Sequence, residues 1–356
     1  MGIAAFGLSG VAWPGEDDVE PGIWLEMGVL ACARGEREEA ERIFRYIERH
    51  FEPPAGIKAY IEAQRRAVCP PPWQGSVSLA LGYSSNATRG PDLTAYRLGV
   101  TVPAEITLAP HQRAQPDYFV EAVGHLDSRL GPGHLSAYAN LRHHQNWSLY
   151  DEDWIGLHYH IQRHWPPLGR AVMSLGHAWM WLGGQAYAQV LSGEASLQRG
   201  PLRYTLQGKQ LHYPGASAYD GHILNVYLDY SLNGGNWRLR GRMGGFADDA
   251  HAGRPGGDRK GWHSMLYFAY AGQRASVVEA SWHHERARSN DVYFPGLIEL
   301  RRHKRAHRLE LAWTLPKYDG EAWRISLVHA RGLDSIPFLT YRQTEIVLSW
   351  VRPLSW

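Results

Sequence analysis

The sequence predicts a mainly β protein, a transmembrane antiparallel β-barrel preceded by a short α-helical module. From about Ser76 to Trp356 the chain is a succession of roughly ten-residue segments in which apolar and polar residues alternate. No stretch reaches the roughly 18 consecutive apolar residues that a membrane-spanning helix needs. The 15 Trp and 19 Tyr against 8 Phe are typical of rings that lie at a membrane interface.

The helical module is expected at residues 16–68, after a remnant or wrongly assigned N-terminus at residues 1–15. No Lys or Arg precedes the weakly apolar run before Pro14, so a signal peptide is not recognisable. Further on, apolar residues recur at spacings of three and four, which is the period of a helix. They are Ile23, Met27, Leu30 and Ala31, then Ala40, Ile43, Phe44 and Ile47. We therefore expect two helices, joined at residues 34–36.

The module also resembles a tetratricopeptide repeat, with small residues at Gly28, Ala31 and Ala40 that let paired helices pack closely. An ordinary αα-hairpin is the alternative. Because so few repeats cannot bury their apolar faces alone, we expect either further repeats upstream or support from the barrel. The two cysteines, Cys32 and Cys69, could form a disulfide or remain buried thiols. Consecutive prolines in residues 69–75 predict a stiff linker.

The barrel region, residues 76–356, holds fifteen strand candidates. A single-chain barrel normally has an even number of strands, because both termini face the periplasm. We therefore expect fourteen strands, with residues 85–117 as a long first external loop. Sixteen is the alternative, if both 93–102 and 105–109 are spans. Long connections alternate with tight turns at 131–132 and 233–235, and are placed outside: 145–153, 214–219, 248–260, 287–303 and 332–341.

Within each segment the alternation assigns one face to lipid and the other to a polar lumen. In 221–233 the lipid face holds Leu224, Val226 and Leu228, and the lumen face holds Asn225 and Asp229. The same division separates Leu309, Leu311 and Trp313 from Arg308 and Glu310, and separates Ile346, Leu348 and Trp350 from Glu345 and Ser349. Six tryptophans near strand ends are expected at the membrane interfaces: Trp154, Trp165, Trp181, Trp237, Trp262 and Trp323.

Composition and motifs narrow the function. The 37 Lys and Arg nearly cancel the 35 Asp and Glu, so no nucleic-acid partner is expected. No Gly-x-Ser-x-Gly turn is present, and neither an enzyme nor a cofactor is expected. His158 and His160 lie two apart on a strand and could share the lumen face, but no third ligand is identifiable, so no metal site is predicted.

Two external loops are further candidates for contact with a partner. Residues 248–261 read as flexible and charged, and residues 285–305 as notably basic. The alternative for both is a solvated loop without a partner.

Two stretches resemble a known family. Ser335, Ile336, Pro337 and Phe338, followed by Tyr341 and Arg342 and an alternating final strand, look like the last hairpin of the surface lipoprotein assembly modulator proteins, also called type XI secretion translocators. Tyr83 and Asn86 after the first strand look like that family's Tyr-x-x-Asn stretch. The chain departs from the pattern in lacking an Asn after Ser335 and in ending on Trp rather than Phe.

The resemblance implies an outer-membrane barrel that delivers a partner, a lipoprotein or a small soluble haem- or metal-acquisition protein, from the periplasm to the cell surface of a bacterium. The helical module would then lie in the periplasm. Besides this cargo, the expected partners are outer-membrane lipid and the barrel-assembly machinery. The assembly signal that this machinery would read is formed by the alternating Leu348, Trp350, Leu354 and Trp356.

Two other functions compete with this one. A polysaccharide-export porin also joins tetratricopeptide repeats to a barrel, but its lumen should carry charges of one sign. The lumen face predicted here mixes Arg308 with Glu310, which favours the translocator. A passive porin is the remaining alternative, and it would have no use for the helices.

Overall fold

The computed structural model describes residues 21–34, 37–51, 53, 56–58, 61–62, 73–98, 104–165, 167–251, 253–272, 276–317 and 320–355. The chain divides into two compact units, a helical unit up to Trp73 and a barrel unit from Gln74 to Ser355. Each is considered by itself. The expectations about residues 1–15, most of the 69–75 linker, Cys69 and Trp356 lie outside the described residues.

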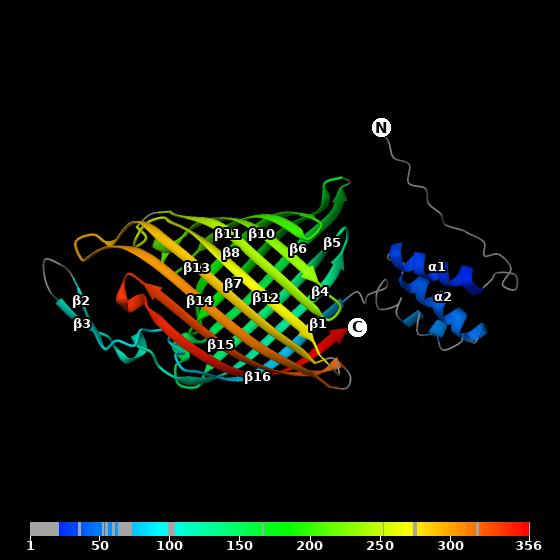
Figure 1. Ribbon diagram of the computed structural model, residues 1–356, viewed down its shortest axis with the longest axis horizontal. Coiled ribbons are helices and arrows are strands. Elements are labelled where there is room, and N and C mark those ends of the chain that lie inside the picture. Colours follow the sequence, from blue (N-terminus) through cyan, green and yellow to red (C-terminus); the bar gives the residue numbers. More distant parts are fainter. Residues whose placement is uncertain are drawn as a thin grey trace. The chain divides into compact units, whose positions relative to one another are not determined.

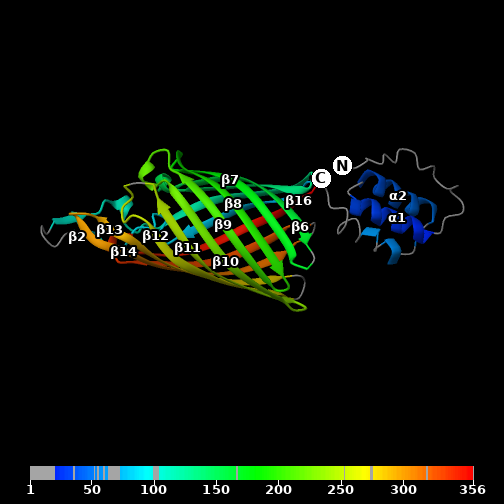
Figure 2. The same ribbon diagram turned by 90° about the horizontal axis from the view of Figure 1, so that it is seen from above.

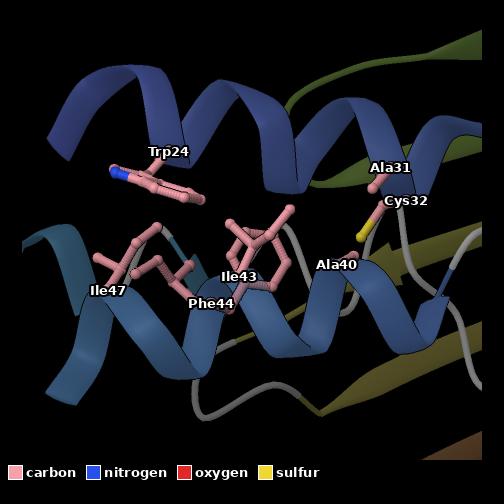
Figure 3. Packing of buried hydrophobic residues seen from close by; sticks show 8 residues of the cluster. Trp24, Ala31, Cys32, Ala40, Ile43, Phe44 and Ile47 are labelled. Atoms are coloured by element: carbon pink, nitrogen blue, oxygen red, sulfur yellow. The ribbon is translucent and has the colours of Figure 1, made fainter. Parts of the chain in front are cut away.

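The helical unit contains α1 (Pro21–Arg34) and α2 (Arg37–His50), with further helical residues at 56–58 and 61–62. Figure 3 shows the side chains of Trp24, Ile43, Phe44 and Ile47 packed between the two helices. A Cβ atom on Gly28 would come within 2.5 Å of the Phe44 ring. The small residues therefore do allow the close helix packing that the sequence indicated.

The buried face of α1 differs from the predicted one. Of the predicted positions Ala31 is buried, but Met27 and Leu30 are 36% and 57% exposed, and Trp24, Gly28 and Cys32 are buried in their place. The Phe44 ring explains the rotation, because it occupies the space that Gly28 of α1 leaves open. Cys32 is disulfide-bonded.

No described helix is both long and apolar enough to cross a membrane.

Among the residues that the structure describes, fourteen strands form a closed antiparallel barrel in which sequence neighbours pair and β1 pairs with β16. Figures 1 and 2 show these strands running obliquely along the barrel. Their bounds are β1 (Trp73–Ser84), β4 (Asp117–Leu130), β5 (Gly133–His144), β6 (Glu152–Trp165), β7 (Gly169–Leu182), β8 (Gln185–Arg199), β9 (Leu202–His212), β10 (Gly221–Asn233), β11 (Trp237–Ala250), β12 (Arg259–Ala271), β13 (Val277–Phe294), β14 (Ile298–Pro316), β15 (Ala322–Asp334) and β16 (Tyr341–Ser355).

The expectation of fourteen strands is confirmed, and the alternative of sixteen is wrong. The segments that could have added two spans form only short strands, β2 (Ala95–Leu98) and β3 (Ala104–Thr107). These two pair with each other in the first long loop and are not part of the wall. In Figure 1 they lie at the end of the barrel opposite the C-terminus. That end carries the loops predicted to be external.

One predicted external loop is wrong. Residues 287–303, expected to be a loop, are mostly strand, because β13 continues to Phe294 and β14 begins at Ile298. The hairpin extends past the rest of the wall (Figure 1). Its many arginines and histidines resemble loop composition, but a strand beyond the membrane needs no lipid face and can carry polar residues on both sides.

The two faces of the wall follow the predicted alternation. Leu224, Val226 and Leu228 are 43–57% exposed on the outside, whereas Asn225 between them is 5% exposed inside. Trp165, Trp237, Trp262 and Trp323 are also exposed on the outside. The predicted position of Trp154 at a membrane interface is wrong, because Ile155 and Leu157 are the outward, exposed residues in this part of β6. Trp154 therefore faces the lumen rather than a membrane interface.

Candidate functional site: the barrel lumen

The inner face of β11 carries a stripe of three arginines, Arg238, Arg240 and Arg242. Trp237 and Met243, at the odd positions of this strand, are 39% and 64% exposed on the outside, so the even positions face inward. Residues two apart on a strand are about 6.8 Å apart, which spaces the three guanidinium groups evenly along the lumen. We call these residues the arginine stripe.

The members of the arginine stripe differ in their partners. Arg242 donates to Asp229 at 2.6 Å and lies 4.8 Å from the centre of the Tyr227 ring. Arg238 donates to the amide oxygen of Asn233 at 3.0 Å. Arg240 lies opposite Ser231 and Tyr267 and has no ion-pair partner among the described residues. The stripe thus carries more positive charge than its neighbours neutralise.

Beside Arg242, the member of the stripe nearest the external loops, the lumen contains a cavity of about 410 Å³. Its lining is rich in cations and in ring nitrogens, and includes Arg242, His263, His283, Arg308 and Glu285. The ring of His263 lies 4.7 Å from that of Tyr227, and Gly244 leaves the space that both rings occupy. Nε2 of His263 is buried and has no hydrogen-bond partner among the described residues.

The same cavity is lined by Arg89, which comes from the first external loop rather than from the wall. The loop turns inward directly after β1, where Asn86, Ala87 and Thr88 are buried. Arg89 Nη1 lies 3.4 Å from a carboxylate oxygen of Glu152 on β6. Among the residues that the structure describes, Arg89 is the one non-glycine residue with a positive φ, at 50°. This is a costly conformation that persists only where surrounding contacts enforce it.

Those contacts come from Asn86. Its side-chain nitrogen donates to the carbonyl oxygens of Gly90 and Arg342, at 2.8 and 2.9 Å. Its side-chain oxygen accepts the Gly90 backbone N–H at 3.2 Å. The Asn86 side chain therefore closes the turn that contains Arg89 and fastens it to β16.

A buried polar network lies below this turn, where β16, β1, β4 and β5 adjoin. Arg142 of β5 is within 3.0 Å of Glu345 on β16 and within 3.3 Å of Glu121 on β4. Gln343 donates to Ser84 at 3.0 Å and to Glu345 at 2.9 Å. Because β1 contributes small residues here, Arg142 can reach across it. The network joins the first and last strands from inside.

Ion pairs of both signs recur around the rest of the lumen. Arg203 pairs with Glu194, Lys304 with Glu285, and Arg324 with both Glu279 and Glu310. The mixture of Arg308 with Glu310 that the sequence indicated is present, at 3.5 Å. The lumen is therefore polar and mixed in sign, with an excess of cations at the arginine stripe.

The two family-like stretches meet at the loop end of the β1–β16 seam. Asn86 bonds to the backbone of Arg342, and the amide of Ser85 donates to Thr344 at 2.9 Å. Tyr341 lines the lumen cavity. Tyr83 is on the outside with its ring 5.2 Å from that of Tyr118.

The remaining residues of the closing stretch hold the last external turn. Ser335 bonds to the backbone of Arg301 and His303, both at 2.9 Å. Ile336 is 1% exposed against Ile298. Pro337 begins the short helix η6 (Pro337–Leu339), and the Phe338 ring stacks on Tyr96 of β2 at 4.7 Å. This turn thereby joins β14, β15 and the β2–β3 hairpin.

Of the expected assembly signal, Leu348 is 45% exposed on the outer face and Leu354 is half-buried beside Gly75. Trp350 donates its indole N–H to Glu321 at 3.2 Å.

His158 and His160 face the lumen, as predicted. Each is stacked on another ring, His158 on Tyr138 at 5.7 Å and His160 on His134 at 5.1 Å. No group of three or more metal-ligating side chains occurs among the residues that the structure describes.

The external loop predicted at 248–261 contains a buried ion-pair network. Asp248 is 2% exposed and accepts from Arg254 at 2.7 Å and from Arg259 at 2.5 Å. A single buried carboxylate therefore holds both sides of the loop.

Sequence reasoning missed the arginine stripe and Arg89, for different reasons. The alternation of Arg238, Arg240 and Arg242 with apolar residues is visible in the sequence and would have placed all three in the lumen. Nothing local places Arg89 there, because its position depends on Arg342, more than 250 residues away.

No family model matches this chain, and no curated protein matches it. Solved structures of similar fold include OpdK of Pseudomonas aeruginosa with vanillate, at 12% identity and a TM-score of 0.40, covering 80% of this chain and 99% of that one. Others are an anion-selective porin from Comamonas acidovorans (10%, 0.39, 79% and 98%) and a bacterial polysaccharide outer membrane secretin (9%, 0.43, 79% and 98%). At these values the likeness is one of barrel fold alone.

Proposed function

We propose that this chain is an outer-membrane channel whose lumen passes anionic solutes in preference to cations. The observation that carries the proposal is the arginine stripe, in which Arg240 has no ion-pair partner among the described residues. Fixed cations in a narrow lumen raise the local concentration of anions and oppose the entry of cations.

The outer-membrane location rests on the wall itself. A closed barrel leaves no unpaired strand edge in hydrocarbon, and its outer face here is apolar along the middle of each strand. The short turns and the C-terminus lie at one end, which is the periplasmic end in barrels of this kind.

The lumen cavity supplies a place for an anion to pause. Arg89, Arg242 and Arg308 approach it from the first loop, β11 and β14. Each of the three is paired with one carboxylate, Glu152, Asp229 or Glu310. An anion entering it would meet guanidinium groups that can donate further hydrogen bonds.

The test is the reversal potential of the purified full chain in planar bilayers under a KCl gradient. Wild type is expected to be chloride-selective, and Arg238→Gln/Arg240→Gln to lose most of that preference while still conducting. Arg163→Gln, at an exposed outward position of β6, is the matched control and should behave as wild type. A cation-selective wild type, or a double variant with unchanged selectivity, would contradict the proposal.

A second candidate is delivery of a lipoprotein or small secreted protein to the cell surface. The observation that favours it is the helical unit, which has its own buried core and would have no use in a passive porin. Polysaccharide export is less favoured, because the lumen pairs charges of both signs instead of carrying one sign.

Co-expression separates the two candidates. A neighbouring secreted or lipidated protein is produced with and without this chain in a host that lacks both, and intact cells are treated with protease. Delivery predicts that the cargo is cleaved only when this chain is present, and no longer when residues 16–67 are removed from an assembled barrel. Surface exposure of the cargo in cells without this chain would contradict delivery, and the anion channel would then be the remaining candidate.

A further inference from the structure

The outer wall of the barrel carries a group of cations at the loop end of β12, β13 and β14. Lys260, Arg286, Arg288, Arg301 and Arg305 are all exposed and all occupy outward positions of these strands. The outward register is fixed by Trp262, Trp282 and Leu309, which are 39–45% exposed on the same faces. We call these five residues the outer basic patch.

The strand register places the members of the patch directly beside one another. Arg286 is paired with Arg305 across β13 and β14, and Lys260 is paired with Arg288 across β12 and β13. Directly opposite residues of this kind have Cβ atoms about 4.5–5.5 Å apart, and like charges at that distance destabilise the sheet. His303 lies in the row of Lys260 and Arg288, and His307 is paired with His284 in a row nearer the middle of the wall.

No ion pair involving these five side chains occurs among the described residues, in contrast with the charges of the lumen. Along β14 the outward acidic residue is Glu299, two positions beyond Arg301 near the hairpin tip, and on β11 the exposed Asp249 lies one outward position beyond Ala247, the partner of Lys260. The row that contains His307 continues through Arg331 of β15 to Arg342 of β16. Those two arginines line a shallow cavity with Asp92 and are therefore left out of the patch.

Elsewhere at the loop end of the wall, an outward basic side chain does have carboxylate neighbours. At the loop end of β5 and β6, the outward His143 lies 3.1 Å from Asp151 and 3.3 Å from Asp153. The repulsion in the outer basic patch is thus not a general property of this end of the barrel.

The height of the patch on the wall indicates its ligand. Trp262 is paired with Arg286, and Trp282 lies four residues further along β13 toward the opposite end of the barrel. Exposed tryptophans of this kind mark the boundary between hydrocarbon and headgroups. Trp282 itself is paired with the apolar Leu266 of β12 and the apolar Leu309 of β14. The patch therefore lies at headgroup level, with acyl chains against the wall beneath it.

We propose that the outer basic patch binds the phosphate groups of an anionic lipid in the leaflet at the loop end of the barrel. Guanidinium groups bind phosphate oxygens in a bidentate manner, and neighbouring arginines can hold two phosphates of one headgroup. The occupant is a lipid rather than a soluble anion because the cations are flush with the lipid-facing wall. This inference does not depend on what passes through the lumen.

The experiment uses the full chain in nanodiscs that contain either a bis-phosphorylated glycolipid of the lipid A type or only phosphatidylcholine. Native mass spectrometry measures retained lipid, and the heat-induced change in gel migration measures the unfolding midpoint. Wild type should retain the phosphorylated lipid and unfold at higher temperature with it. Arg286→Gln/Arg305→Gln should bind it roughly 30-fold more weakly, since each cation near an anionic surface contributes about fivefold in affinity.

The control is Arg163→Gln/Arg352→Gln, which removes two exposed outward arginines at the other end of the barrel and should bind as wild type. If the patch variant does not fold, about 0.5 M NaCl should release the lipid from wild type, because salt at that concentration screens the attraction between the arginines and the phosphates. Equal retention by the patch variant and wild type would overturn the proposal. So would an equal stabilisation by inorganic phosphate in phosphatidylcholine discs, which would indicate a site for soluble anions.

Discussion

At the scale of single residues, glycines on the inner face of the wall determine where large side chains can lie. A Cβ atom on Gly82 would come within 2.2 Å of the Phe119 ring, which is 3% exposed. The guanidinium of Arg142 lies 4.2 Å from the centre of that ring. One missing methyl group on β1 thus allows Phe119 and Arg142 to take the positions on which the seam network depends.

Replacing Gly82 by Ala should therefore destabilise the barrel by about 1–3 kcal/mol, the usual cost of overpacking. The reason is displacement of Phe119, so Phe119→Leu in the same chain should recover part of the loss. Unfolding in urea from lipid vesicles measures both variants. Additive effects of the two substitutions would show that Gly82 acts through some other neighbour.

Adjacent residues of β7 test the assignment of the two faces. Leu175 is 61% exposed on the outside in the middle of the strand, and Ser174 faces the lumen opposite Glu194. Leu175→Arg should cost about 2–4 kcal/mol, because its charge enters hydrocarbon near the mid-plane. Ser174→Arg should cost far less in the same unfolding assay, because it gains water and a carboxylate. Equal losses would mean that the lipid and lumen faces are wrongly assigned.

At the scale of elements, alternation was enough to predict the barrel and the lumen positions of His158 and Arg308, whereas the number of fourteen strands also required the even-number rule and the loop lengths. It did not predict where strands stop. Residues 287–303 lie beyond the level of Trp262. Their composition therefore no longer indicates a lipid face, although their backbone pairing continues, with register shifts, to Phe294 and Ile298. Trp154 was misplaced for a related reason, because a tryptophan near a strand end fits either face.

The loop between β9 and β10 is closed by Asp220. Its carboxylate accepts the Tyr213 amide at 2.6 Å and contacts His212 at 2.9 Å. These hydrogen bonds, first from the Tyr213 backbone and then from His212, lower the pKa of Asp220 below its ordinary value near 3.8. A lowered pKa means that the carboxylate stabilises the loop fully above that ordinary value and ceases to do so as pH falls through the lowered one.

Hydrogen exchange of the Tyr213 amide should follow this dependence. Protection, corrected for the intrinsic exchange rate, is expected to be constant from neutral pH to about 4 and to fall in more acidic solution. Asp220→Asn should lose much of the protection already at neutral pH. Protection in the wild type that persists unchanged well below the ordinary pKa of an aspartate would exclude this role.

At the scale of the whole molecule, the decisive contacts join residues that are far apart in sequence. The first and last strands are held in register from Gln74–Ser355 to Ser84–Glu345, and Arg142 connects the wall on either side of them. Local pattern identifies each of these residues as inward-facing. It does not identify the partner, because pairing across 203 positions depends on the closure of the barrel.

Assembly of the barrel is expected to depend on the alternating end of β16. Leu348 is on the outer face, and Trp356 continues the pattern in the sequence. We expect that deleting Trp356 reduces the heat-modifiable form of the protein in outer-membrane fractions, because the barrel-assembly machinery would read a terminal aromatic residue. Assembly of the deletion variant at wild-type levels would remove this basis for recognition.

Closure itself is tested at Arg142. The side chains of Glu345 and Arg142 are only 4% and 16% exposed, so Arg142→Met would leave Glu345 without a counter-charge in a nearly dry position. Breaking a buried pair in this way costs about 3–5 kcal/mol, whereas removing both charges costs much less. Arg142→Met/Glu345→Gln should therefore be more stable than Arg142→Met alone, when both are compared by the temperature at which the folded band disappears from a gel. Arg163→Met, on the outer face of β6, is the control for loss of an arginine. If Arg142→Met unfolded at the same temperature as that control, the seam would be held by its backbone pairing alone.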